Sequence, residues 1–162
     1  MTTTHTEWRS QDDVPTYQPP TGGAPRAVIV DIDGTLARRI EPGRHWTDWA
    51  RVNEDTPVNA VITTVRALHA AGHKILVLSG RPAVCRAATE AWLAEHLDFP
   101  YEKLLMRPDR DFRPDWAMKA LLFDEHIRHQ YAVQLVLDDR DQVVTLWRAI
   151  GLPCFQVAPG DF

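Results

Sequence analysis

Residues Ala27–Thr35 read AVIVDIDGT and decide both the fold of this chain and the place of its chemistry. Four aliphatic residues in succession predict a strand that is buried on both faces, as in a parallel sheet. Asp31 and Asp33 follow directly, so both carboxylates leave the carboxyl end of that strand, where open α/β folds bind ligands. Gly34 permits a sharp turn because glycine adopts backbone angles that other residues avoid. Thr35 then offers a hydroxyl and an amide to an anion.

A second acidic pair follows another aliphatic run. Residues 135–140 read LVLDDR, so Asp138 and Asp139 leave a second predicted strand at the same edge of the sheet. Two carboxylates about 4 Å apart repel by roughly 4 kcal/mol at an effective dielectric constant of about 20. Such a cluster stays ionised only beside a cation or basic partners, and all-oxygen ligands favour a hard ion, above all Mg²⁺. The two pairs together predict a magnesium site that faces an anion.

The length and composition of the chain indicate one catalytic domain. At 162 residues and 44% apolar content, the chain is long enough for one sizeable core and too short for two ordinary domains. A net charge of −4 provides no overall basic field, so any polynucleotide contact must be local. No apolar run of about 18 residues and no signal-peptide pattern occurs, so we expect a cytoplasmic protein without membrane contact. Cys85 and Cys154 are expected to be buried thiols rather than a disulfide.

Two regions are expected along the chain. Residues 1–25 are polar and rich in Pro, Gly and Thr, which predicts a flexible leader, and residues 26–162 form the catalytic domain. Strands are predicted at about residues 27–30, 74–78, 103–106, 133–137 and 154–157. Helices are predicted from Pro57 with Thr56 as the cap, from Pro82, from about Asp115 and from about Gln142, after an irregular stretch at 37–55. This alternation predicts an α/β fold, a Rossmann-like three-layer sandwich with a central, mainly parallel five-stranded sheet.

Further polar residues follow the ends of these strands. Ser79 and Arg81 come after the second strand, and Lys119 comes from the helix between the third and fourth strands. With them the chain resembles the haloacid-dehalogenase superfamily of phosphotransferases, whose members carry a DxDGT loop, a Ser or Thr, a Lys and an acidic pair in this order. Each motif is weak by itself, but four in the expected order at the expected strand ends form a specific pattern.

The resemblance implies a role for each of these residues. Asp31 would attack phosphorus and form an aspartyl-phosphate. Asp33 would protonate the leaving oxygen and later deprotonate the attacking water, as general acid and then base. Ser79 and the Gly80 amide would hold one phosphate oxygen, and Lys119 would offset the charge of Asp31 and of the phosphate.

The same resemblance implies how Mg²⁺ is held. Its ligands would be Asp31, the Asp33 carbonyl and one residue of the terminal acidic pair, with waters completing an octahedron. Asp139 is the preferred ligand of that pair, because family members with a Gly-Asp motif use the second position. Asp138 would then orient Lys119 or a metal-bound water.

No room is left for the cap domains that many superfamily members carry. The two usual insertion points offer only about 19 residues after the first strand, and fewer than about ten, Arg107–Pro114, after the third. The expected fold is therefore capless. An uncapped site is open to the end of a large substrate, although an oligomeric neighbour would also be able to cover it.

A closer resemblance narrows the substrate. The chain is similar to the phosphatase domain of bacteriophage polynucleotide kinase/phosphatase, which removes 3′-phosphates from nucleic-acid ends. The shared blocks are VDIDGTLA at 30–37, SGR at 79–81, DDRDQVV at 138–144, WR at 147–148 and QVAPGDF at 156–162. This resemblance implies DNA or RNA 3′ ends as substrate. It also implies four further phosphate-site residues, namely Arg44, Arg81, Arg107 and Asp115.

Several of these residues have simpler interpretations. Arg44 and Arg107 are also consistent with surface charges, and Asp115 with a helix cap. Arg81 is less easily explained that way, since a planar guanidinium beside Ser79 suits bidentate recognition of phosphate. Three tryptophans near the expected mouth, Trp46, Trp49 and Trp116, suit either stacking on a terminal base or packing in the core.

Three functions stay open on the sequence. The first is a Mg²⁺-dependent polynucleotide 3′-phosphatase in nucleic-acid end repair, and the second is a nucleotide or small phosphoester monophosphatase with the same mechanism. The third is a non-catalytic binding module, against which Asp31, Asp33 and Lys119 are all present. No GxxxxGK[ST] phosphate loop occurs, so we expect a free-standing phosphatase with a separate kinase or ligase partner. The oligomeric state does not follow from the sequence.

Overall fold

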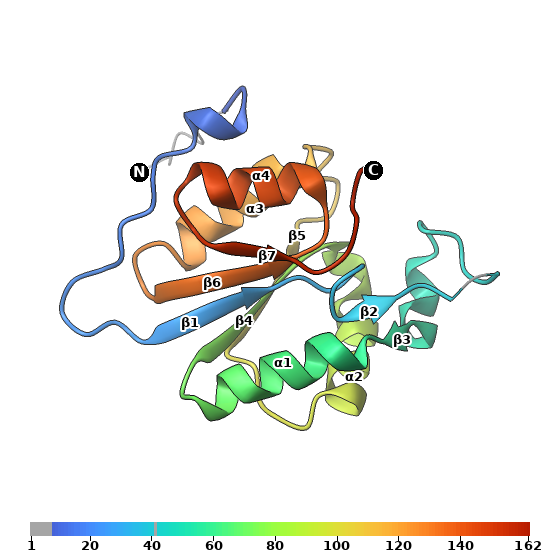
Figure 1. The fold of residues 1–162 in the computed structure, drawn as a ribbon. Helices are drawn as coiled ribbons and strands as arrows, with labels where there is room; N and C mark the ends of the chain where they lie inside the picture. The colour runs from blue at the N-terminus through green and yellow to red at the C-terminus, as the bar shows by residue number, and fades with distance from the viewer. Residues whose placement is uncertain (1–7, 41) are drawn as a thin grey trace.

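The computed structural model describes residues 8–40 and 42–162 and has the predicted α/β architecture (Figure 1). Its five-stranded sheet has the order β5-β4-β1-β6-β7, and every neighbouring pair is parallel. The strands are β1 (Arg26–Val30), β4 (Lys74–Pro82), β5 (Lys103–Arg107), β6 (Ala132–Asp138) and β7 (Cys154–Gln156). The helices α1 (Asn59–Ala70) and α2 (Arg86–His96) cover one face, while α3 (Asp115–His126) and α4 (Asp141–Ala149) cover the other. The predicted three-layer sandwich is confirmed.

The central strand β1 explains why its sequence is a continuous aliphatic run. Ala27 and Ile29 pack into the core beneath α3 and α4, whereas Val28 and Val30 pack into the core beneath α1 and α2. All four side chains are at most 1% exposed. Side chains alternate between the two faces of a strand, so a strand covered on both faces needs apolar residues at every position.

The segment between β1 and α1 differs from the prediction. Thr56 and Pro57 are not the cap and first residue of a helix but a short strand, β3 (Thr56–Pro57), which pairs antiparallel with β2 (Ala37–Arg38). Proline is tolerated on such an edge pair because its missing N–H removes no necessary ladder bond. The Val58 amide then donates to the Leu36 carbonyl at 2.8 Å. Pairing with a strand distant in sequence therefore takes precedence over the local helix-start signal.

No cap domain interrupts the described part of the chain. Between β1 and α1 lie only β2, β3 and the short helix η2 (Trp49–Glu54), and between β5 and α3 the residues 108–114 form a loop. β4 also continues through Pro82, past the predicted end at residue 78, before the short helix η3 (Ala83–Cys85). The site at the carboxyl ends of the strands is thus uncapped, as the sequence predicts.

Residues 8–25 do not behave as the flexible leader that their composition predicts. After the short helix η1 (Gln11–Asp13), Val14 and Tyr17 are buried in the core beneath α3 and α4. The Tyr17 hydroxyl donates to the Tyr131 carbonyl at 2.7 Å, and its ring lies 5.5 Å from that of Phe123. Two well-placed apolar side chains anchor a segment whose average composition is polar. Residues 1–7, the rest of the predicted leader, lie outside the described residues.

The two cysteines are buried free thiols, as predicted. Burial raises the pKa of Cys154 to about 12 and also raises the pKa of Cys85, so both stay protonated at neutral pH. Among the helices of the described residues, none has both the length and the apolar character needed to cross a membrane.

Candidate active site

The register of the three central strands brings the predicted site residues to one edge of the sheet. Val30, the last residue of β1, pairs with Val77 of β4 on one side and with Leu137 of β6 on the other. The next residue, Asp31, donates its amide to the Leu137 carbonyl at 3.0 Å. Asp31 and Asp138 therefore follow paired residues of adjacent strands, and Ser79 lies two residues past Val77 on the neighbouring β4, although the three are far apart in sequence.

Lys119 joins the two acidic pairs. Its Nζ donates to Asp31 Oδ1 and to Asp138 Oδ2, at 2.7 Å in each case, and all three side chains are buried. Burial by itself would lower the pKa of Lys119, but Asp138 and Asp31 raise it above its ordinary value. The lysine is thus a permanent cation. It holds Asp31 in a fixed orientation at the end of β1.

Three carboxylates form a cluster that is able to hold a cation. Asp31, Asp138 and Asp139 each offer an oxygen within 4.8 Å of the others. Asp138 is already engaged at both oxygens, because Oδ2 accepts from Lys119 and Oδ1 accepts the amides of Asp139 at 3.0 Å and Arg140 at 3.3 Å. Among the described residues, no side chain donates a hydrogen bond to the Asp139 carboxylate. Asp139 therefore has the spare acceptor capacity that a metal ligand needs.

The electrostatics of the cluster also favour a cation. Burial, followed by repulsion from Asp138, raises the pKa of Asp139 to about 6. Burial raises the pKa of Asp31 well above its ordinary value, Lys119 opposes this change, and the two neighbouring carboxylates add to it. One lysine does not balance three buried carboxylates. A divalent oxygen-binding ion would supply the missing charge.

The turn after Asp33 contains a hydroxyl group, on Thr35, that is able to bind an anion. Gly34 has a φ of +86°, and a Cβ atom there would lie 1.9 Å from Asp139 Oδ2, so glycine is required for both the turn and the close approach. The Thr35 amide, which the sequence offers to an anion, instead donates to the Ile32 carbonyl at 3.1 Å. The Thr35 hydroxyl is buried and has no hydrogen-bond partner within the described residues. A buried hydroxyl of this kind suits a phosphate oxygen.

Arg81 binds the expected general acid rather than an open phosphate pocket. Its Nε and Nη2 donate to the two carboxylate oxygens of Asp33 at 2.8 and 2.7 Å. The Arg81 side chain is fully buried, while that of Asp33 is 43% exposed. The amide of Arg81 donates to Ser79 Oγ at 3.2 Å. The Arg81 guanidinium, which we expected to bind phosphate, thus fixes the orientation of Asp33.

Asp55 is a site residue that the sequence did not predict. Its carboxylate accepts from Arg44 Nε and Nη2 at 2.7 Å each, and from Arg81 Nη2 at 2.8 Å. Arg44 in turn lies 3.7 Å from Asp33 and is buried rather than a surface charge, while its role at the phosphate stays a prediction. Asp55 is only 3% exposed, whereas the neighbouring acid, Glu54, is exposed at the surface. Nothing in the run Asn53-Glu54-Asp55 shows which acid turns inward.

A row of alternating charges lies on the α3 and α4 side of the site. The Asp115 carboxylate contacts Arg107 through one oxygen and Arg140 through the other. Asp115 therefore positions arginines, and it makes no helix-capping hydrogen bond. Arg107 also donates to the Gly80 carbonyl at 3.1 Å, which ties the row to the loop after Ser79. The sequence did not single out Arg140, although it directly follows the acidic pair.

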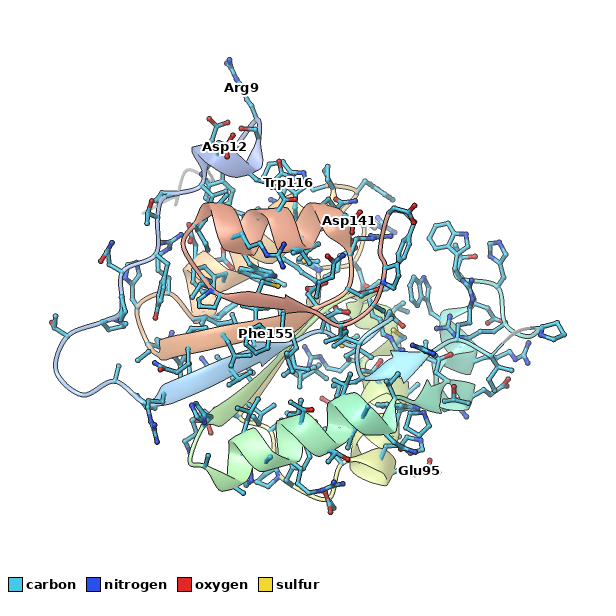
Figure 2. All side chains as sticks on the ribbon, in the orientation of Figure 1. Arg9, Asp12, Glu95, Trp116, Asp141 and Phe155 are labelled. Carbon is cyan, nitrogen blue, oxygen red and sulfur yellow. The ribbon has the colours of Figure 1, made fainter. Side chains whose placement is uncertain are left out.

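The C-terminal residues pack on the loop that carries the acidic pair. The Gly160 carbonyl accepts the Asp141 amide at 2.8 Å, and a Cβ atom at position 160 would lie 2.1 Å from the Asp139 carbonyl oxygen. Figure 2 shows Asp141 at the start of α4, beside this C-terminal stretch. The Phe162 ring lies 4.8 Å from the Arg140 guanidinium. Residues 156–162, one of the sequence blocks shared with the polynucleotide kinase/phosphatase domain, thus support the loop that carries the acidic pair.

The three tryptophans named from the sequence have different environments. Trp49 and Trp116 are half-buried and pack against the two cores, one on each side of the sheet. Trp46 is 60% exposed, in the loop that also carries Arg44. Packing therefore accounts for two of the three, and Trp46 stays available at the mouth.

Comparisons with known proteins agree on one family. A family model described as the polynucleotide kinase PNKP phosphatase domain matches residues 25–162. A curated protein of Autographa californica nuclear polyhedrosis virus, whose name describes a bifunctional polynucleotide kinase/RNA ligase, is 38% identical over 140 residues. Those residues are 85% of this chain and 20% of the viral protein.

Two solved structures are also similar, and both are titled as Pnkp1/Rnl/Hen1 complexes, one of them as an RNA repair complex. One matches with a TM-score of 0.83 and 40% identity over 91% of this chain, and the other with 0.82 and 39% over 93%. The chain covers 47% and 52% of those two chains, so it spans about half of their length.

Proposed function

This chain belongs to the family of the polynucleotide kinase PNKP phosphatase domain, and from that premise we propose that it removes 3′-phosphates from DNA or RNA ends. The family makes it a phosphatase of the haloacid-dehalogenase type that acts on nucleic-acid ends. The observation that carries the reaction is Lys119, which holds Asp31 and Asp138 together 2.7 Å from its Nζ at the open edge of the sheet.

The first step is transfer of the phosphoryl group to the enzyme. An Asp31 carboxylate oxygen attacks phosphorus, and the bond between phosphorus and the 3′ oxygen breaks. Asp33 gives a proton to that oxygen, and the nucleic acid leaves with a free hydroxyl. The Arg81 fork holds Asp33 in one orientation beside the nucleophile. The enzyme then carries an aspartyl-phosphate.

The second step returns the enzyme to its starting state. Asp33 takes a proton from a water molecule, whose oxygen attacks the phosphorus of the aspartyl-phosphate. The bond between phosphorus and Asp31 breaks, and orthophosphate leaves. Lys119 stays charged through both steps and offsets the negative charge on Asp31. Ser79 and the Thr35 hydroxyl, which is buried without a partner among the described residues, would bind phosphate oxygens.

The residues present suit Mg²⁺ as the resident ion. Asp31 and Asp139 would hold it, with the Asp33 carbonyl, and Asp138 would keep its place on Lys119. The fit rests on an all-oxygen donor set and on the buried carboxylate of Asp139 beside Asp31 and Asp138. When bound, such an ion neutralises charge on the phosphate and on the carboxylates around it.

The relatives suggest a setting for this activity. The viral relative is named as both a kinase and an RNA ligase, and the two solved relatives are in complexes titled with further components. We infer that this chain works in nucleic-acid end repair, with kinase or ligase activities that act on the same break.

Phosphate release from a matched set of substrates tests the proposal. The set contains DNA and RNA oligonucleotides with a 3′- or a 5′-phosphate and the corresponding mononucleotides, each with Mg²⁺ and with a chelator. We expect Mg²⁺-dependent release from 3′-phosphorylated oligonucleotides and none from 5′-phosphorylated ones. Asp31→Asn is the control and should release no phosphate. Equal turnover of mononucleotides and oligonucleotides would instead favour a small phosphoester substrate, and activity that survives Asp31→Asn would exclude the proposed nucleophile.

A further inference from the structure

Exposed apolar side chains gather around the mouth of the active site. Among the described residues, the large apolar side chains with high exposure are Ile40, Trp46, Val84, Phe112, Phe155 and Phe162. All except Phe155, which lies on β7, belong to segments that follow the carboxyl ends of strands, on the same side of the sheet as the acid cluster. Exposed apolar side chains on loops at the catalytic edge are candidates for contact with a ligand.

Phe112 is the most exposed of these residues and stands on a loop that is held firmly. Arg107 donates to the carbonyls of Asp111 at 3.1 Å and Arg113 at 2.8 Å, one on each side of Phe112. The same loop is tied to η3, because the Val84 amide donates to the Asp109 carboxylate at 2.8 Å. Phe112 is nevertheless 92% exposed. Its ring contributes nothing to the core, so the fixed loop presents it to solvent or to a ligand.

Trp46 stands on a second loop that is anchored beside the site. The loop that carries it is anchored by Arg44, whose guanidinium binds Asp55 and lies 3.7 Å from Asp33. The same guanidinium contacts the Trp46 carbonyl at 3.5 Å. The Trp46 side chain is 60% exposed. The backbones of both loops are therefore held by arginines that reach the catalytic edge of the sheet.

We propose that Trp46 and Phe112 are stacking platforms for the bases next to the 3′-phosphate of a single-stranded nucleic-acid end. This inference rests on the proposed function and assigns residues to its substrate recognition. With the terminal phosphate at Asp31, the bases that precede it would lie on the two exposed rings.

The chemistry at this edge of the sheet, rather than local charge, favours nucleic acid over a protein partner. The Phe112 loop carries Asp109 and Asp111 as well as Arg110 and Arg113, and Arg44 near Trp46 is paired with Asp55. Arg110 is exposed and has a φ of 60°, which a non-glycine residue seldom adopts, so the loop has a specific shape. Base-aromatic stacking also tolerates any sequence, as an enzyme that acts on broken ends requires.

The test compares two substrates in the same enzyme. For wild type, Phe112→Ala, Trp46→Ala and Phe155→Ala, kcat/KM is measured on a 3′-phosphorylated single-stranded hexanucleotide and on a nucleoside 3′-monophosphate. Phe155→Ala is the matched control, because Phe155 is a 59% exposed aromatic residue on the edge strand β7 (Figure 2). We expect the ratio of the two kcat/KM values to fall by about tenfold in each mouth variant, mainly through KM, and to be unchanged in the control. Circular dichroism and thermal unfolding verify that each variant folds.

The possible outcomes distinguish a failure of the stacking role from a failure of the proposed 3′-phosphatase function. If wild type prefers the hexanucleotide and both mouth variants keep that preference, the stacking role is wrong, the proposed function stands, and the exposed ring becomes a surface for another protein. If wild type shows no preference for the hexanucleotide, the stacking role and the polynucleotide substrate both fail. A fall in the ratio for Phe155→Ala equal to that of the mouth variants would also overturn the inference.

Discussion

The role of each charged residue in this site depends on the ion pair that it forms. Lys119 is the clearest case, because one cation bridges the nucleophile Asp31 and the strand-end acid Asp138 inside the protein. Buried carboxylates without a cation are costly, so the lysine contributes to folding as well as to chemistry. Measuring the stability of a Lys119 variant at different pH values distinguishes its role in folding from its role in the reaction.

Replacing Lys119 with Met should abolish phosphate release and destabilise the fold. Removing one partner of a buried ion pair costs about 3 to 5 kcal/mol. In the variant, Asp31 and Asp138 lose their cation, so their protonation at low pH relieves the strain. Urea unfolding should therefore show a larger loss of stability at pH 8 than at pH 5. An equal loss at both pH values would contradict this account of the buried carboxylates.

Asp55→Asn tests the arginine network behind the general acid. The asparagine keeps the shape but removes the charge that joins Arg44 to Arg81, so the fork on Asp33 loses its support. We expect kcat to fall by roughly tenfold to a hundredfold, as for other groups that orient catalytic residues. Glu54→Gln is the matched control, since Glu54 pairs with Arg51 at the surface, and its kcat should be unchanged. Equal activity of the two variants would remove Asp55 from the positioning network.

At the scale of elements, the site depends on how closely the loops at the strand ends pack. The loop after β6 is in contact with Gly34 on one side and with Gly160 of the C-terminal stretch on the other. The loop after β5 is held by Arg107, and the loop after β2 by Arg44. The strands fix the edge, and these loop contacts fix the side chains at that edge.

Gly160→Ala should weaken metal binding without removing any ligand. The new methyl group would lie 2.1 Å from the Asp139 carbonyl oxygen, so the loop with the acidic pair must shift. We expect a severalfold rise in the Mg²⁺ concentration needed for half-maximal activity, and a lower melting temperature. Asp161→Ala, an exposed neighbour in the same stretch, is the control and should resemble wild type in both measurements. A normal Mg²⁺ requirement in Gly160→Ala would show that the C-terminal stretch does not support the site.

At the scale of the whole molecule, the acid cluster couples stability to pH and to Mg²⁺. The pKa of Asp139 is about 6 in the fold, above its ordinary value of 3.8. Between these values the folded chain keeps a proton that the unfolded chain has lost. The contribution of Asp139 to the stability of the metal-free protein therefore falls as pH rises from about 4 to 6.

Added Mg²⁺ should reverse this loss above pH 6. The ion competes with the proton for Asp139, so we expect Mg²⁺ to raise the melting temperature at pH 7.5 and to have little effect at pH 5. Scanning calorimetry with Mg²⁺ and with a chelator measures the difference. Asp139→Asn should abolish the Mg²⁺ effect at both pH values. A shift of equal size at pH 5 and pH 7.5 would mean that the ion binds elsewhere.

Short stretches of sequence are enough to predict the layers of this protein and the strand ends that carry its chemistry. The aliphatic run before Asp31 and the one before Asp138 each predict a buried strand, since strand periodicity and burial are encoded within a few neighbouring residues. The order of the motifs then placed Asp31, Ser79, Lys119 and Asp138 at one edge, as the structure places them. Family resemblance supplied their roles.

Only the tertiary structure decided which groups are partners. Arg81 binds Asp33 across 48 residues of sequence, and Asp55 turns inward to join Arg44 and Arg81 while Glu54 stays outside. Thr56 and Pro57 form a strand rather than a helix start, and Tyr17 fixes a segment of polar composition to the core. Such choices depend on contacts between segments distant in sequence, whose free energy exceeds the small local preferences that a sequence pattern records.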